Sequence, residues 1–325
     1  MALLSRIADT LYWMSRYLER VDNTARLLEI NLLHLVEAEE GQPGSAPWRP
    51  LLAISGSEEA FAERHPGAEM TAARVIRFLT QERGNSNAIH PSLRLARENA
   101  RVVRDRISKE MWQALNDLWL GVDRRLKTAL RREQAAAFYA SLRSEVARFH
   151  GLTDSTMVRG EAHAFYRLGT LVERADMSAR ILDVKYHTLL PDLSMVGSPL
   201  DYYQWAALLK SLSGFEAYRR QYHGGLRPGD VAEFVVFEAS FPRSLRFCVE
   251  GIGEALRTVS GEAPPGRSGE AVRELSELLG VSTATVLEQG IHEFLERFIA
   301  QVAGLNAALG VEYFEVYPEA DRCAM

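Results

Sequence analysis

The stretch LYWMSRYLERVDNTARLLEI, residues 11–30, carries two patterns in one helix-length segment. Apolar residues recur from Leu11 to Leu28 at alternating steps of three and four, the spacing of a helix that buries one face. Four charged residues crowd the edge of that face: Glu19, Arg20, Asp22 and Arg26. The first pattern predicts a packed helix. The second leaves open whether the charges bind a ligand or hold helices together.

The same pattern returns 154 residues later, where residues 165–184 read FYRLGTLVERADMSARILDV. The two stretches align without a gap and share seven identities: Tyr12/Tyr166, Glu19/Glu173, Arg20/Arg174, Asp22/Asp176, Ala25/Ala179, Arg26/Arg180 and Leu28/Leu182. Weaker matches follow, including Ser92-Leu93-Arg94 with Ser244-Leu245-Arg246. Because this density exceeds chance, we predict a duplicated unit of about 150 residues, a typical domain size. We expect the halves, 1–150 and 151–325, to pack into one globular unit around a pseudo-twofold axis.

The composition is that of an ordinary globular protein, with 325 residues, 47% hydrophobic and 25% charged. Helical periodicity runs through nearly the whole chain and is broken where Gly, Pro and Ser cluster, as at residues 83–92. This pattern predicts an all-α helical bundle of about ten helices. Only VEYFEVYP, residues 311–318, has the alternation of an extended segment.

Charge and cysteine content exclude several classes of protein. The net charge of −5 provides no global field for nucleic acid or an anionic membrane. The two cysteines, Cys248 and Cys323, supply neither a disulfide framework nor a zinc ligand set, which fits a reducing cytoplasm, and Cys248 lies on an apolar pattern typical of the core. No apolar run approaches the roughly 18 residues of a membrane span. We therefore expect a cytoplasmic protein without membrane or nucleic-acid partners.

The charged set common to both stretches has two interpretations. It predicts an ion-pair network where the two equivalent helices cross, each arginine fork closing on a carboxylate and fixing their register. Alternatively, the set lines a site for a zwitterionic or peptide-like ligand, with Arg20, Arg26, Arg174 and Arg180 as binding residues. The network is favoured, because structural ion pairs perturb charge without forming active sites.

A second candidate site occurs in only one half. Residues 82–107, ERGNSNAIHPSLRLARENARVVRDRI, are polar, whereas residues 237–259 of the other half, FEASFPRSLRFCVEGIGEALRTV, are not. Asn85, Ser86 and Asn87 form a polar loop, and Ser92 is placed to cap the next helix. Charged residues continue on that helix: Arg94, Arg97, Glu98, Arg101 and Arg104. Together they predict either a seat for a carboxylate or phosphate, or a solvated charged face.

Other chemistries find no support in the sequence. There is no Glu-x-x-His motif of a di-iron bundle, no phosphate-binding glycine loop and no nucleophile elbow. Glu288, His292 and Glu296 share one helical face at steps of four, a spacing more typical of a solvated surface than of a metal site. Trp112 and Trp119, seven residues apart, are expected in the core or a subunit interface. We predict no metal site.

Three long segments resemble the Alpha-E family, bacterial all-helical proteins catalogued as a domain of unknown function. They are LSRIADTLYWMSRYLERVDNTARLLE at 4–29, NSNAIHPSLRLARENARVVRDRISKEMWQALN at 85–116, and FYRLGTLVERADMSARILDVKYH at 165–187. The resemblance covers essentially the whole chain. One departure is Ser15, which stands where the family signature is expected to carry glycine and calls a close helix contact into question.

The resemblance implies a functional context. Alpha-E proteins are typically encoded beside, or fused to, a circularly permuted ATP-grasp protein, often with a transglutaminase-like protein nearby, and ATP-grasp enzymes join a carboxylate to an amine through an acyl-phosphate. This implies an accessory role in an amide- or peptide-forming system, with ATP and magnesium belonging to the partner and no cofactor expected in this chain.

Two other functions stay open. The first is a stand-alone enzyme acting on an amide, peptide or acyl intermediate, in which arginines hold a carboxylate and one acidic residue serves as general base. The candidates for that base are Glu19, Asp22, Glu173 and Asp176. The second is a purely structural helical homo-oligomer.

Overall fold

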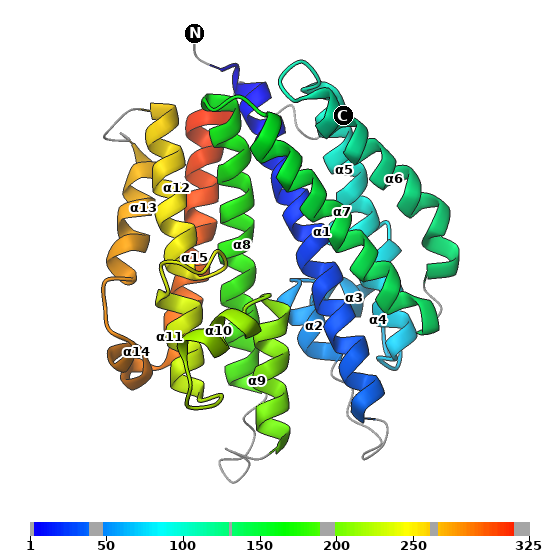
Figure 1. Ribbon diagram of the computed structural model, residues 1–325, viewed down its shortest axis with the longest axis vertical. Helices are drawn as coiled ribbons and strands as arrows, with labels where there is room; N and C mark the ends of the chain where they lie inside the picture. The colour runs from blue at the N-terminus through cyan, green and yellow to red at the C-terminus, as the bar shows by residue number, and fades with distance from the viewer. Residues whose placement is uncertain (1–2, 39–47, 130–131, 189–198, 261–265, 315–325) are drawn as a thin grey trace.

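The protein is an all-α bundle, shown by a computed structural model that describes residues 3–38, 48–129, 132–188, 199–260 and 266–314 (Figure 1). Over these ranges it contains fifteen α-helices, a final π-helical turn and no strand. The predicted fold class is confirmed, but the expected number of about ten helices is too small. Several connections themselves form helices of seven residues, which the periodicity of a longer window does not reveal.

Two long helices, α1 (Ser5–Ala38) and α8 (Glu161–Thr188), form the centre of the bundle (Figure 1). The helices between them are α2 (Trp48–Ile54), α3 (Glu58–Arg64), α4 (Ala72–Gln81), α5 (Ile89–Val102), α6 (Lys109–Ala129) and α7 (Arg132–Thr156). After α8 come α9 (Pro199–Ser211), α10 (Phe215–Gln221), α11 (Pro228–Phe237), α12 (Leu245–Ser260), α13 (Arg267–Leu278), α14 (Thr283–Gln289), α15 (Ile291–Leu309) and η2 (Gly310–Phe314). Helices α5 and α7 pack on α1, and α12 and α15 pack on α8.

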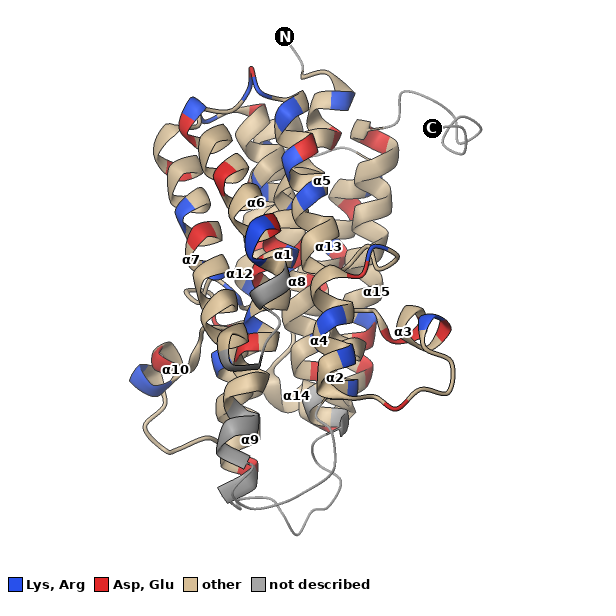
Figure 2. Cartoon of the chain, turned by 90° about the vertical axis from the view of Figure 1, so that its right-hand side faces the viewer, with Lys and Arg blue, Asp and Glu red and all other residues tan. Residues whose placement is uncertain are grey.

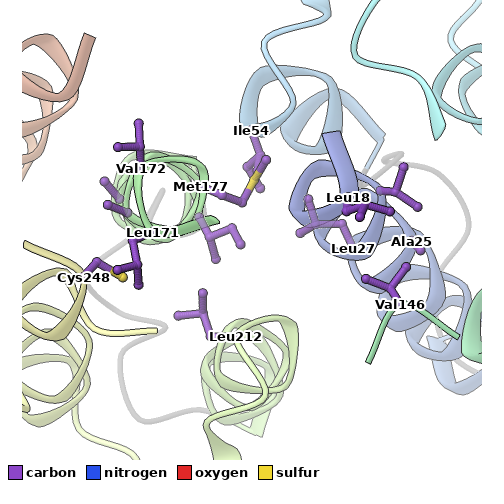
Figure 3. Close-up of a cluster of buried hydrophobic side chains, with 14 of the residues drawn as sticks. Leu18, Ala25, Leu27, Ile54, Val146, Leu171, Val172, Met177, Leu212 and Cys248 are labelled. Atoms are coloured by element: carbon purple, nitrogen blue, oxygen red, sulfur yellow. The ribbon is translucent and has the colours of Figure 1, made fainter. Parts of the chain in front are cut away.

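One hydrophobic core runs through both halves. The apolar seam predicted for α1 is buried from Leu11 to Leu28, and the corresponding face of α8 is buried as well. Figure 3 shows Leu18 of α1, Leu171 of α8 and Cys248 of α12 within this core, which confirms the core position expected for Cys248. No helix in the described ranges is both long and apolar enough to cross a membrane.

The close contact between α1 and α8 is preserved in spite of Ser15. The Ser15 hydroxyl is fully buried and donates to the carbonyl oxygen of Tyr12 at 2.9 Å. Opposite it lies Gly169, its equivalent 154 residues later, where a Cβ would overlap both the Tyr12 carbonyl oxygen and the Ser15 hydroxyl. The glycine that permits the approach therefore comes from α8. Contacts advance together along the two helices, from Leu3 with Glu161 through Ser15 with Gly169 to Arg20 with Glu173, so α1 and α8 cross while running in the same direction.

The helix cap predicted at Ser92 is wrong. Ser92 does not cap a helix: α5 begins at Ile89, and the Ser92 hydroxyl lies in its first turn and donates to the Ser86 carbonyl oxygen at 3.1 Å. Pro91 fits there because the first turn needs no donated backbone bond. In the other half Ser244 does precede α12, and its hydroxyl accepts from the Phe247 amide at 3.0 Å.

Two further predictions, an extended segment at residues 311–318 and a shared helical face for Glu288, His292 and Glu296, do not match the structure. Residues 311–314 of VEYFEVYP are helical rather than extended, since Phe314 is buried with its ring centroid 5.0 Å from that of Tyr12, and residues 315–318 lie outside the described ranges. Glu288 does not share a face with His292 and Glu296. Gly290, at φ +101°, separates α14, which carries Glu288, from α15.

The close approach predicts a specific destabilisation. Gly169→Ala should lower the free energy of unfolding by about 1–3 kcal/mol, because its methyl group forces α8 away from the α1 backbone. Urea denaturation measures the change. Gly151→Ala on α7 is the matched control: nothing lies within 4 Å of its Cβ position, so helix propensity should leave this variant as stable as the parent or slightly more stable. Equal stabilities for the two variants would contradict the proposed contact.

Candidate functional site

The two Glu-Arg dipeptides of α1 and α8 exchange partners across the crossing. Arg20 of α1 closes on Glu173 of α8, with Nε to Oε1 at 2.6 Å and Nη2 to Oε2 at 3.0 Å. Arg174 of α8 closes in the same way on Glu19 of α1, with both bonds at 3.0 Å. Acidic and basic residues accordingly meet on α1 and α8 in the middle of the bundle (Figure 2). The structure thus contains the interlocked forks that the network interpretation predicts.

Each glutamate also has a second arginine, and sequence reasoning missed both. Glu173 Oε2 accepts from Arg16 Nε and lies 2.8 Å from Arg16 Nη2. Glu19 Oε1 accepts from Arg243 Nη1 at 2.9 Å. Arg16 could have been found, since it lies one helical turn before Arg20 and points to the same side. No pattern links Arg243 to α1, because 224 residues separate it from Glu19.

The arginines keep both glutamates ionised. Burial by itself would raise the pKa of Glu173, but the charges of Arg20 and Arg16 and their hydrogen bonds outweigh it and lower this pKa to about 2. Burial likewise opposes ionisation of Glu19, and Arg174 and Arg243 lower its pKa well below the ordinary value. A carboxylate with so low a pKa and two arginine partners is a weak proton acceptor at neutral pH. This arrangement favours a structural role for Glu19 and Glu173.

A pocket of about 340 Å³ opens beside the Glu173 pairs. Helices α1, α2, α8 and α15, the turn after α2 and the loop before α5 supply its walls. Its polar lining comprises Arg16, Arg20, Thr24, Ser55, Asn87, Glu173, Asp176, Arg180 and Asn306. Its apolar lining includes Ile54, Val172 and Met177, and Figure 3 shows Ile54 of α2 and Met177 of α8 pointing toward each other. The pocket therefore takes residues from both halves and adjoins the predicted charged set.

Two arginines of the pocket are held by protein acceptors. Arg16 Nη1 donates to Asn306 Oδ1 at 2.6 Å, in addition to its bonds with Glu173. Arg20 Nη1 donates to Asn87 Oδ1 at 3.0 Å, and the amide nitrogen of Asn87 donates to the Ser55 carbonyl oxygen. Their guanidinium groups are therefore fixed walls of the pocket rather than free ligand donors.

Arg180 differs from these two arginines. Its Nε donates to Asp176 Oδ2 at 2.9 Å, while its terminal Nη groups have no protein acceptor within the described ranges. Its side chain is 34% exposed and that of Asp176 22% exposed, so solvent reaches both. The pair presents an open carboxylate oxygen and an open guanidinium edge next to each other, a combination suited to binding a small charged molecule.

The corresponding pair in α1, Asp22 and Arg26, is enclosed. Arg26 is 4% exposed and bonds Asp22, and burial, with Arg243 nearby, lowers its pKa to about 10. Asp22 also pairs with Arg243 Nη2 at 2.9 Å. Of the predicted ligand-binding arginines, Arg20 and Arg180 therefore line the pocket, whereas Arg26 and Arg174 lie on the other side of the crossing.

The polar loop before α5 contributes one residue to the pocket. Asn85 is buried, and its Oδ1 accepts from the Asn87 amide at 3.0 Å, so it holds the loop that presents Asn87. Ser86 and Ser92 bond each other and do not line the pocket. These three residues shape the site without forming its surface.

The charged stripe of α5 lies apart from the pocket. Arg97 donates to Asn116 Oδ1 at 2.9 Å and lies over Trp112, and Arg101 pairs with Glu98 at 2.8 Å. Arg97 comes eight residues after the start of α5, roughly 12 Å along its axis at about 1.5 Å per residue. The structure therefore does not combine these arginines with the N-terminus of the helix. Trp112 and Trp119 are half-buried against the core.

The described part of the chain contains no group of three or more His, Cys, Asp or Glu side chains that could hold a metal ion. His292 instead pairs with Asp183, with Nδ1 and Oδ1 2.6 Å apart, and lies 3.6 Å from Glu296. The side chains that the pocket offers for binding are thus arginines, carboxylates and amides.

The buried pairs predict a loss of stability on neutralisation. Glu173→Gln should lower the free energy of unfolding by about 3–5 kcal/mol, because Arg16 and Arg20 would stay buried without their counter-charge. Glu98→Gln is the control, since its pair with Arg101 is exposed and contributes at most about 1 kcal/mol. A Glu173→Gln protein that unfolds at the same urea concentration as the parent would show that the fork does not stabilise the crossing.

Acid should weaken the same pairs. The pKa of Glu173 is lowered from an ordinary 4.5 to about 2, so its contribution is complete above pH 4.5 and lost as the pH falls toward 2. The shift corresponds to about 3 kcal/mol. The unfolding free energy, measured from pH 6 to pH 2, should therefore fall in this window, and less steeply in Glu173→Gln. An identical slope in the two proteins would contradict this linkage.

Comparisons with known proteins agree with this architecture. The chain is 25% identical over 322 residues to the uncharacterized proteins Mb2597 of Mycobacterium bovis and Rv2567 of Mycobacterium tuberculosis, covering 94% of this chain. It spans only 35% of the length of those relatives. No solved structure matches it. The Alpha-E family, described as "a predicted alpha-helical domain with a conserved ER motif", matches residues 3–314, and the Glu-Arg dipeptides at 19–20 and 173–174 are the ones that exchange partners here. The chain belongs to the Alpha-E family.

Proposed function

We propose that this chain is an accessory component of an ATP-grasp-type amide- or peptide-ligase system, binding an amino-acid or peptide substrate, the ligase partner, or both. The observation that carries the substrate-binding role is the open Asp176–Arg180 pair in a pocket of about 340 Å³. A pocket of this size with a few convergent polar groups is typical of small-molecule sites. The ligase context rests on the resemblance to proteins encoded with a circularly permuted ATP-grasp protein and, often, a transglutaminase-like protein.

The arginine pairs of Glu19 and Glu173 support an accessory role rather than a catalytic one. Glu19 and Glu173 are held by two arginines each, which leaves them poorly suited to accept a proton from a substrate amine. Activation of a carboxylate as an acyl-phosphate also requires a phosphoryl donor. In this proposal the donor is ATP, bound by the ATP-grasp partner. The chain would then position a substrate or the ligase in the cytoplasm, where ATP is available.

The length of the relatives is consistent with work in a larger assembly. The matched region covers 35% of the mycobacterial proteins, so in them a segment similar to this chain is joined to further sequence. A stand-alone enzyme is the second candidate, and one observation favours it: Asp176 lines the pocket and has a single arginine partner, so it could face a bound amine.

Reconstitution with the partner tests this proposal. The purified chain and an ATP-grasp protein encoded beside its gene should elute together from a size-exclusion column, and adding the chain should raise amide formation measured as ADP release with an amino-acid mixture. Arg180→Gln should reduce that stimulation, whereas Arg101→Gln on α5 should keep it. Amide formation or hydrolysis by the chain alone would favour the enzyme instead. Separate elution combined with unchanged ligase activity would contradict the accessory role.

A further inference from the structure

The pocket has a counterpart on the other side of the α1–α8 crossing. Under the repeat offset, Glu173, Asp176 and Arg180 of the pocket correspond to Glu19, Asp22 and Arg26. The surrounding helices correspond as well. The Tyr12 hydroxyl lies 2.7 Å from Asn306 of α15, and its equivalent, the Tyr166 hydroxyl, lies 2.8 Å from His150 of α7.

In the counterpart, a guanidinium group occupies the position that the pocket leaves open. Arg243 Nη1 donates to Glu19 Oε1 at 2.9 Å and to Asn23 Oδ1 at 2.8 Å. Its Nη2 donates to Asp22 Oδ2 at 2.9 Å, and its side chain is only 13% exposed. The residue that corresponds to Arg243 beside the matched Ser-Leu-Arg segments is Pro91, which carries no charge. One copy of the site is therefore closed by its own cation, and the other is open.

We infer that the pocket binds a free α-amino acid as a zwitterion. Its ammonium group takes the position that the Arg243 guanidinium has in the counterpart, against Asp176 and Glu173 Oε1. Its carboxylate binds the open Nη edge of Arg180. This inference rests on the proposed function and names the substrate class of the same pocket.

The charge arrangement fits such a ligand. Asp176 and Arg180 stand side by side with opposite charges, as do the ammonium and carboxylate on the α-carbon of an amino acid. Three arginines face two carboxylates in the pocket, which leaves an excess positive charge and disfavours a second cation on the ligand. Alanine and glutamate should therefore bind more tightly than lysine or arginine. Ile54, Val172 and Met177 provide an apolar wall for the rest of the molecule.

Calorimetric titration of the full chain tests the inference with four probes: L-alanine, L-glutamate, N-acetyl-L-alanine, which lacks the cation, and L-alaninamide, which lacks the carboxylate. The first two should bind, and each blocked compound should bind at least about tenfold more weakly, a loss of about 1.4 kcal/mol. Asp176→Asn and Arg180→Gln should weaken L-alanine and L-glutamate by a similar factor. Both side chains are partly exposed, so the variants should fold. Arg101→Gln, outside the pocket, should titrate like the parent.

Several results would overturn the inference. Equal binding of L-alanine and N-acetyl-L-alanine would show an anion site without a cation subsite. Unchanged titration of Asp176→Asn and Arg180→Gln would place amino-acid binding elsewhere on the chain. If none of the twenty standard L-amino acids binds the chain, alone or with the ATP-grasp protein, the zwitterion assignment fails. Co-elution with that protein and stimulation of its activity would then still support the accessory role, so the two failures are distinguishable.

Discussion

The exchange of arginine forks between α1 and α8 is the constraint on which the rest of the bundle depends. Two carboxylates and four arginines are withdrawn from water at the crossing, which is costly unless every charge meets its partner. That condition is satisfied only in one register, with Glu19 level with Arg174 and Glu173 level with Arg20. A slip of one residue would leave buried charges unpaired. The apolar seams supply most of the driving force for association, and the forks determine how the helices meet.

The same exchange explains why the two sides of the crossing can differ. Because the two arginine forks fix the register of α1 and α8, the residues beside each fork can differ between the two sides of the crossing. On one side Arg243 completes the shell of Glu19 and Asp22. On the other side, the second partner of Glu173 is Arg16, which approaches from the side of Tyr12. The space between Glu173 and Asp176 therefore stays open as part of the pocket. The duplication stays a prediction, supported by the reciprocal pairs and by the equivalent tyrosine contacts. It offers a physical reason for one closed and one open site.

The crossing of α1 and α8 could be predicted from the sequence more fully than the pocket beside it. The repeated dipeptides and their helical spacing predict the crossing and its forks, because both depend on local periodicity and on a fixed offset. The contacts of Arg243 with α1 come from a loop 224 residues away from Glu19, and no spacing in the sequence reveals them. For the same reason the sequence does not show that Pro91, at the matching position, leaves the other site open. Ser15 correctly marked a close contact between helices, but the glycine that permits this contact is Gly169, on the other helix. The stripe of α5 misled for the opposite reason: its regular spacing is real, yet its arginines bond Asn116 and Glu98 away from the pocket.

Building the pocket on this frame has a consequence for any ligand that enters it. Glu173 is shared between the fork of Arg20 and the pocket wall, and Arg16 and Arg20 are held from behind by Asn306 and Asn87. A ligand that places charge against Glu173 therefore acts on the groups that set the register of α1 and α8. Binding in this position should stiffen the crossing rather than move a peripheral loop, because the donors are preorganised and the core around them is closely packed. The crossing that holds the two halves together is thus the same element that a bound substrate would contact, and a partner bound to either half, as proposed, would be able to sense an occupied pocket through it.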